Sequence, residues 1–130
     1  MGAVRAGAGA WLTEIIAGII EPGESAEDVV RREAIEESGC PILQLEPVCN
    51  FYASPGGTSE RISLYCGRVD ASRAGGIHGC SNEGEDIRVF TASFTETLAM
   101  IHDGRINSAS PIMAIQWLSM NRDRLRTQWQ

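Results

Sequence analysis

The segment Gly18–Cys40, GIIEPGESAEDVVRREAIEESGC, encodes one helix together with both of its ends. Ser25 is a favourable N-cap residue, and Asp28, three positions later, supplies the acidic partner of a capping box. Gly39 is the residue type that most often ends a helix, and the proline that follows at position 41 cannot continue one. We therefore expect a helix from about Ser25 to Ser38, held between two loops.

Three glutamates, Glu33, Glu36 and Glu37, crowd the second half of this helix. Residues three and four apart are neighbours on a helix, so like charges there repel, at a cost of a few tenths of a kcal/mol per pair. The helix contains no lysine, and Arg31 and Arg32 can offset only part of the repulsion. A divalent cation would remove it, and a donor set made only of oxygens favours Mg²⁺ or Mn²⁺. A solvated acidic helix is the alternative interpretation.

Length and charge restrict the remaining possibilities. A chain of 130 residues without an internal boundary predicts one domain. The formal net charge of −6, with no basic cluster, argues against nucleic acid or an anionic membrane as partners. No secretory signal is evident, and the four cysteines form no CxxC pair that would indicate zinc. We therefore expect a cytoplasmic protein with reduced thiols.

The order of predicted elements is typical of an α/β fold. The Gly/Ala-rich residues 1–10 are expected to form a weakly structured N-terminal segment. Apolar and β-branched runs predict strands over residues 11–20, 46–52, 61–69 and 87–90. Residues 71–86 are expected to form a long glycine-rich loop. Two further helices are expected, one after the Ser93 capping box to about residue 103, and one from about residue 110 to 126.

The spacing within the first helix and its preceding loop resembles a known signature. Gly18 is followed after five residues by Glu24, and seven residues later by the run REAIEESGC that starts at Arg32. This pattern resembles the complete Nudix box, whose family hydrolyses nucleoside diphosphates linked to another moiety and uses divalent metal. The resemblance implies a single Nudix domain over residues 1–130, an α/β/α sandwich with a mixed sheet and a loop–helix–loop metal site.

A second motif, FYASPGGTSERISLY, places Pro55 fifteen residues after Cys40. It resembles the ADP-ribose pyrophosphatases, and GRVDAS, GIHG, NEGEDIRV and IQWL extend the similarity towards the C-terminus. By itself Pro-Gly-Gly would indicate only a hairpin turn, and GDP-mannose-type pyrophosphatases share the feature. The resemblance implies Mg²⁺-dependent hydrolysis of the pyrophosphate bond of ADP-ribose or a related nucleoside diphosphate sugar, giving AMP and ribose 5-phosphate.

The resemblance also assigns roles to individual residues. The metal ligands would be the carboxylates of Glu33, Glu37 and Glu85 and the backbone carbonyl of Ala17. Glu36 would act catalytically, as a further ligand or by positioning the attacking water.

The acidic loop SNEGEDIRV supplies the general base in related pyrophosphatases, which here would be Glu83. Asp86 is the competing candidate for either role in that loop.

Other residues are expected to bind the substrate or to brace the site. Glu24 and Arg32 would hold the loop–helix–loop together, with Arg32 pairing with Glu24. The expected substrate contacts are Gly18, Ser54, Pro55 and Glu60.

Pyrophosphatases of this type usually carry a longer segment ahead of the box, and only 17 residues precede Gly18 here. We therefore expect much of the adenine-binding and dimer-forming surface to be absent. An uncovered sheet edge favours a partner, so a homodimer is expected. The competing hypothesis is a truncated, inactive Nudix domain that acts as a nucleotide-binding or interaction module.

Overall fold

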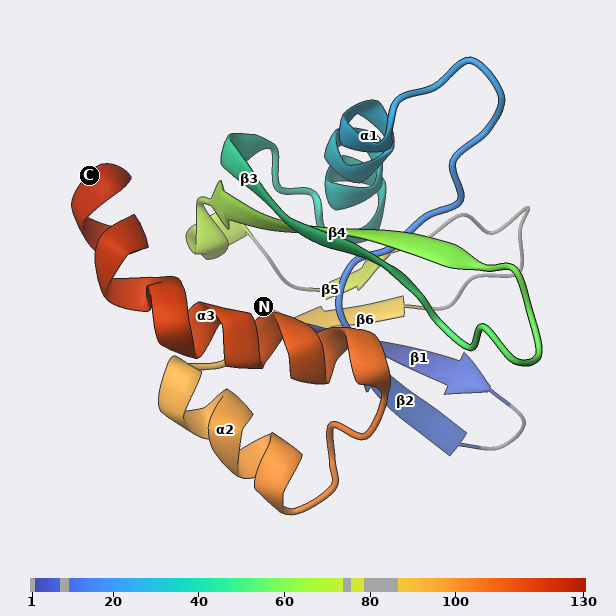
Figure 1. The fold of residues 1–130 in the computed structure, drawn as a ribbon. Helices are drawn as coiled ribbons and strands as arrows, with labels where there is room; N and C mark the ends of the chain where they lie inside the picture. The colour runs from blue at the N-terminus through green and yellow to red at the C-terminus, as the bar shows by residue number, and fades with distance from the viewer. Residues whose placement is uncertain (1, 8–9, 74–75, 79–86) are drawn as a thin grey trace.

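The computed structural model describes residues 2–7, 10–73, 76–78 and 87–130 (Figure 1). Its strands are β1 (Gly2–Gly7), β2 (Ala10–Glu14), β3 (Ile42–Tyr52), β4 (Arg61–Val69), β5 (Gly76–His78) and β6 (Ile87–Phe90). Its helices are α1 (Ala26–Ser38), α2 (Phe94–His102) and α3 (Ala109–Gln128), with a short 3₁₀ helix over Ala71–Arg73. The element order therefore confirms a mixed α/β chain.

Both predicted ends of α1 are confirmed. The Ser25 hydroxyl accepts a hydrogen bond from the Asp28 backbone N–H at 3.1 Å. At the other end Gly39 takes a left-handed conformation with φ of 72°, and its N–H donates to the Ile35 carbonyl at 2.8 Å. This conformation favours glycine, which explains why the helix stops there.

The strands form two separate sheets. One has the order β2-β1-β6-β5, and the other is the hairpin of β3 and β4. Every strand pairing in the described part of the chain is antiparallel, so the expected mixed sheet is wrong for this part. A parallel pair needs a crossover within one sheet, whereas α1 connects β2 to β3, which belong to different sheets.

Strand β1 is the largest departure from the sequence prediction. Residues 1–10 were expected to be weakly structured, but Gly2–Gly7 form a strand with β2 on one edge and β6 on the other. Ala3, for example, is paired with Glu14 and with Val89. Pairing on both edges overrides the low strand preference of a Gly/Ala-rich segment.

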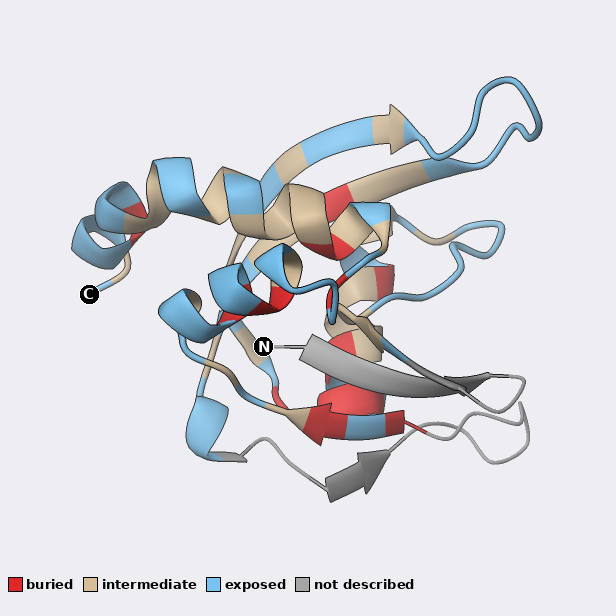
Figure 2. Ribbon diagram, turned by 90° about the horizontal axis from the view of Figure 1, so that it is seen from below, coloured by how far each residue is buried: buried red, intermediate tan, exposed pale blue. Residues whose placement is uncertain are grey.

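The helices lie on opposite sides of the strands. Figure 1 shows α1 on one side of the strands and α2 and α3 on the other. α1 contacts β5 and β6, whereas α3 contacts β4 and α2. Figure 2 shows buried positions on β6 and on the inward-facing parts of the helices. The buried apolar residues are Val29, Ala34, Cys40, Leu64, Ile87, Val89, Met100, Ile106 and Leu125.

A charged contact ties α3 to the hairpin. The Arg124 guanidinium donates to both carboxylate oxygens of Glu46 on β3, at 2.9 and 2.6 Å. The hydrogen bond from Arg124 lowers the pKa of Glu46 below its ordinary value. This contact joins segments far apart in the sequence and helps to fix the position of the hairpin.

The described cysteines are free thiols: Cys40 is buried, Cys66 is half-buried and Cys49 is exposed. Burial raises the pKa of the Cys66 thiol. Cys80 lies outside the described residues. Within the described part of the chain, no helix combines the length and apolar character needed to cross a membrane.

Candidate functional site

The loop before α1 packs directly on two of the helix glutamates. The backbone N–H of Ala17 donates a hydrogen bond to Oε2 of Glu37 at 3.1 Å. Next to it, a Cβ added to Gly18 would lie 2.3 Å from Cγ of Glu33, far inside the normal carbon contact distance of about 3.5–4.0 Å. Any residue other than glycine at position 18 would therefore clash with the Glu33 side chain in its observed position.

The rotation of α1 separates the three clustered glutamates. Glu37 is 2% exposed and the side chain of Glu33 is 13% exposed, whereas the side chain of Glu36 is 53% exposed. Successive residues are about 100° apart around a helix, so Glu33 and Glu37 are near neighbours while Glu36 and Glu37 diverge. The expectation that all three gather at one point is wrong for this arrangement: Glu33 and Glu37 approach the loop and Glu36 faces solvent.

Arg32 contacts three carboxylates at once. Its predicted ion pair with Glu24 is confirmed. Nη2 of Arg32 also lies 3.6 Å from Oε1 of Glu33, and Nε of Arg32 lies 4.0 Å from Oε1 of Glu36. Partial desolvation lowers the pKa of Arg32, but the hydrogen bond to Glu24 and the charges of the three glutamates outweigh it and raise the pKa.

Sequence reasoning foresaw only the Glu24 contact of Arg32. The Glu36 contact could have been found from its i,i+4 spacing.

Glu24 is held in turn by the backbone N–H of Glu21, which donates a hydrogen bond to Oε1 of Glu24 at 3.1 Å. The start of α1 is thus fixed by charge as well as by its cap.

The residues present fit part of a magnesium site. Mg²⁺ usually takes one or two protein carboxylates and completes its shell with water and substrate phosphate. Glu33 and Glu37 supply two carboxylates beside the Ala17–Gly18 segment. Because Gly18 has no side chain, there is room for the Glu33 carboxylate next to it. Among the described residues, no three Asp, Glu, His or Cys side chains converge closely enough to hold a metal ion.

The acidic residues of the expected loop SNEGEDIRV lie outside the described residues. Glu83, Glu85 and Asp86 all fall within the interval 79–86, for which no structure is described. Their roles as general base and metal ligand therefore stay predictions.

The predicted substrate residues Ser54, Pro55 and Glu60 are brought together in the loop between β3 and β4. The Ser54 carbonyl accepts hydrogen bonds from the backbone N–H groups of Gly57 at 3.0 Å and Thr58 at 2.9 Å. All of these residues are exposed. Figure 1 places this loop at the tip of the hairpin rather than on α1.

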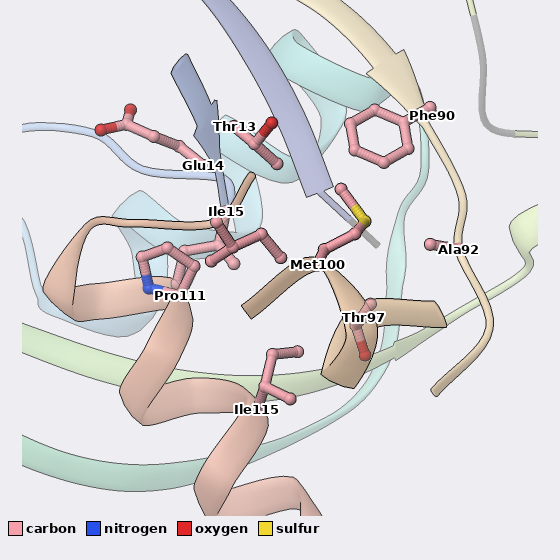
Figure 3. A pocket seen from close by; sticks show the side chains of 10 residues that line it. Thr13, Glu14, Ile15, Phe90, Ala92, Thr97, Met100, Pro111 and Ile115 are labelled. Atoms are coloured by element: carbon pink, nitrogen blue, oxygen red, sulfur yellow. The ribbon is translucent and has the colours of Figure 1, made fainter. Parts of the chain in front are cut away.

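An apolar cavity among the described residues is too small for a nucleotide. Figure 3 shows side chains from β2, β6, α2 and α3 around a common space, with the Glu14 carboxylate pointing away from it. The volume of this space is about 20 Å³. A space of this size holds at most a water molecule. Its lining residues are Thr13, Glu14, Ile15, Phe90, Ala92, Thr97, Met100, Ile106, Pro111 and Ile115.

Comparison with known proteins adds to this geometry. A family model described as NUDIX domain matches residues 3–121. The chain is 50% identical over 119 residues to an ADP-ribose pyrophosphatase of Escherichia coli (strain K12), covering 92% of this chain and 57% of that protein. It is 40% identical to an ADP-ribose pyrophosphatase of Haemophilus influenzae, covering 92% of this chain and 55% of the relative.

A GDP-mannose pyrophosphatase of Pectobacterium atrosepticum is more distant. It is 38% identical over 109 residues, covering 81% of this chain and 53% of that protein. The chain spans somewhat more than half the length of each of these curated relatives.

Proposed function

Because the chain belongs to the NUDIX domain family, we propose that it hydrolyses the pyrophosphate bond of ADP-ribose or a related nucleoside diphosphate sugar. The products would be AMP and ribose 5-phosphate. The observation that supports this best is the packing of the Ala17–Gly18 segment on Glu33 and Glu37. The names of the relatives that are 50% and 40% identical support ADP-ribose as the substrate.

We propose Mg²⁺ as the cofactor, with Mn²⁺ as a possible substitute. Its ligands would be the carboxylates of Glu33, Glu37 and Glu85 and the carbonyl of Ala17. When bound, a divalent cation neutralises the pyrophosphate and the charge that develops on the leaving phosphate, which an acidic chain of net charge −6 cannot do alone.

The chain's own residues would then carry out distinct tasks. The Ala17 N–H holds the Glu37 carboxylate in a fixed orientation. Arg32 braces the start of α1 through Glu24 and limits the repulsion between Glu33 and Glu36. The repulsive cost of the cluster is thereby reduced before any substrate arrives.

The chemical step would use two further acids. Glu36, whose side chain is exposed on α1, would orient the attacking water. Glu83 would take a proton from that water as its oxygen attacks one phosphorus, while the bond from that phosphorus to the bridging oxygen breaks. Ser54, Pro55, Glu60 and the backbone at Gly18 would contact the substrate.

GDP-mannose is the second candidate substrate. Relatives named GDP-mannose pyrophosphatase are 34–38% identical to this chain. A module that binds nucleotide without turnover is the remaining alternative. Substrate identity and turnover must therefore be tested together.

The experiment is a substrate panel with purified protein. ADP-ribose, GDP-mannose and dinucleotides are incubated with Mg²⁺ or with EDTA, and the products are separated chromatographically. We expect AMP and ribose 5-phosphate from ADP-ribose in Mg²⁺ and no reaction in EDTA. Turnover of GDP-mannose alone would select the second candidate, and turnover of nothing in the panel would favour the binding module.

Two matched variants test the role of α1. Glu37→Gln should abolish turnover while the circular dichroism spectrum is retained, because the neutral amide can still accept from the Ala17 N–H but binds a cation weakly. Glu27→Gln is the control, since Glu27 lies on the same helix and is paired with Arg31 at 3.2 Å. Equal turnover by the two variants would contradict the proposed site.

A further inference from the structure

Two adjacent arginines anchor α1 to the chain on either side of it. Arg32 is paired with Glu24 in the loop that precedes the helix. Arg31 donates from Nη1 to the backbone carbonyl of Ile42, the first residue of β3, at 3.3 Å. Arg32 is one of the fixed positions of the Nudix box, whereas Arg31 is not. The contact between Arg31 and Ile42 is therefore a feature that the box does not explain.

The guanidinium of Arg31 is held in place to make this contact. Its Nε and Nη2 atoms donate to Oε1 of Glu27, one helical turn earlier, at 3.3 and 3.2 Å. A planar guanidinium with several donors in a fixed fork can hold two partners at once. The acceptor lies where the pairing of β3 with β4 is irregular, at a shift of register between Ile42 and Gln44. Such a shift disturbs the ladder locally and leaves backbone groups for other partners.

The two arginines leave α1 on opposite sides of Glu37. Successive residues are about 100° apart around a helix, so Arg31 lies about 120° from Glu37 in one sense and Arg32 about 140° in the other. Glu37 itself is directed at the preceding loop, where its Oε2 accepts from the Ala17 N–H at 3.1 Å. The two anchors therefore oppose rotation of α1 in either sense.

A small rotation would be enough to disturb this alignment. An α-helix with its side chains is about 10–12 Å across, so a carboxylate lies about 5–6 Å from the axis and moves about 1 Å when the helix turns by about 10°. The contact of 3.1 Å between Ala17 and Glu37 would then exceed the usual range of about 2.7–3.2 Å. Packing holds the helix weakly against such a turn, because its other buried side chains are the short ones of Val29, Ala34 and Ser38.

We propose that Arg31 is a positioning residue: it fixes the rotation of α1 from the side of β3, so that Glu37 stays directed at the Ala17 N–H. The expected effect on rate rests on the proposed function, whereas the placement of Glu37 can be measured without metal or substrate. Without the contact to Ile42, Arg31 and Glu27 would be an ordinary i,i+4 pair, which contributes little to stability and nothing to the site.

Hydrogen exchange at the Ala17 amide, followed by NMR, tests this inference in the metal-free protein. Arg31→Ala should make this amide exchange about 2- to 13-fold faster, the factor that corresponds to one hydrogen bond, because Glu37 no longer stays in line with it. The Asp28 amide, which donates to Oγ of Ser25 at 3.1 Å, is the internal reference at the start of α1. Its exchange should be unchanged.

Turnover supplies the second readout. Arg31→Ala should lower kcat for ADP-ribose by about 10- to 100-fold, since a displacement of up to about 1 Å is expected, and should raise the Mg²⁺ concentration for half-maximal rate. Arg68→Ala is the matched control, because Arg68 donates to Gln44 at 2.9 Å within the hairpin. It should change neither readout. Glu27→Gln should also change neither, because its amide oxygen still accepts from Arg31.

Three results would overturn the inference. One is an Ala17 exchange rate in Arg31→Ala within about 1.5-fold of the wild-type rate. Another is an equal acceleration of the Ala17 and Asp28 amides, which would show a general loosening of α1. The third is the same acceleration in Arg68→Ala, which would assign the effect to the lost charge. Failure of the proposed function is distinguishable: the substrate panel would show no turnover, while Arg31→Ala would still accelerate exchange at Ala17.

Discussion

Replacing Gly18 by alanine tests the contact between the loop and α1. The new Cβ would lie 2.3 Å from Cγ, 2.5 Å from Cδ and 2.5 Å from Oε1 of Glu33. Ordinary carbon contacts are about 3.5–4.0 Å, so the Glu33 side chain must move by about 1 Å or more. The backbone of Gly18 is not in the left-handed region, so backbone strain does not complicate the result.

Activity should suffer more than stability. Glu33 is a flexible side chain that can swing aside, so the stability loss should lie near the lower end of the about 1–3 kcal/mol typical of overpacking. A displacement of about 1 Å at a reacting site can cost on the order of 100-fold in rate. We therefore expect Gly18→Ala to fold, to lose about 1 kcal/mol, and to hydrolyse ADP-ribose on the order of 100-fold more slowly.

The assay combines urea unfolding with initial rates over a range of Mg²⁺ concentrations. Gly104→Ala is the matched control, because Gly104 has φ of 84° and no atom within 4 Å of an added Cβ. It should lose about 1–2 kcal/mol through backbone strain and keep its activity. The two alanine variants should therefore show opposite patterns.

A double-mutant cycle identifies the partner. In a Glu33→Ala background the clash is removed, so Gly18→Ala should cost almost nothing in unfolding free energy, with a coupling of about 1 kcal/mol between the two positions. The reasoning is refuted if Gly18→Ala retains wild-type activity and stability, or if its stability cost is the same with and without the Glu33 side chain.

Other variants test separate parts of the proposal. Glu83→Gln should lower kcat by about 10²–10⁴-fold without changing the Mg²⁺ concentration that gives half-maximal rate. Glu85→Gln should instead raise that Mg²⁺ concentration. Near-full activity of Glu83→Gln at saturating Mg²⁺ would place the general base elsewhere. Because the pKa of Glu46 is lowered in the folded protein, its pairing with Arg124 stabilises the fold fully above the unfolded-state pKa of about 4.3. This stabilisation is lost as the pH falls through the lower folded-state pKa. In urea titrations, the free energy of unfolding of Glu46→Gln should therefore depend less on pH below about pH 5 than that of the wild type. The protein is expected to be a dimer, and light scattering that shows a stable monomer at micromolar concentration would count against it.

Features determined by nearby residues were predictable from the sequence. The ends of α1 follow from Ser25 and Gly39, and the structure confirms both of them. The physical cause of each helix end lies within about one helical turn, so no tertiary information is needed. The ion pair between Arg32 and Glu24, which the structure also confirms, was implied by the resemblance to the Nudix box rather than by local helix geometry.

Features that depend on packing were not predictable. The direction of Glu36 is set by the rotation of α1, which follows from burial of Glu37 against the loop. The sequence predicts a loop over Gly76–His78, yet this segment forms β5 because β6 offers it a pairing edge. Gly2–Gly7 likewise become a strand through partners that lie far away in the sequence.

The pairing of β1 with β6 also affects how the chain is made. Gly2 is paired with Phe90, so one edge of β1 stays without its partner until the chain has been synthesised at least as far as Phe90. An open strand edge on a nascent chain is a site for aggregation. The segment GAVRAG contains small residues and one arginine, and lacks the strongly apolar run that promotes cross-β association. The Gly/Ala-rich composition of this segment, which does not predict a strand, is thus suited to limiting aggregation at the open edge of β1 during synthesis.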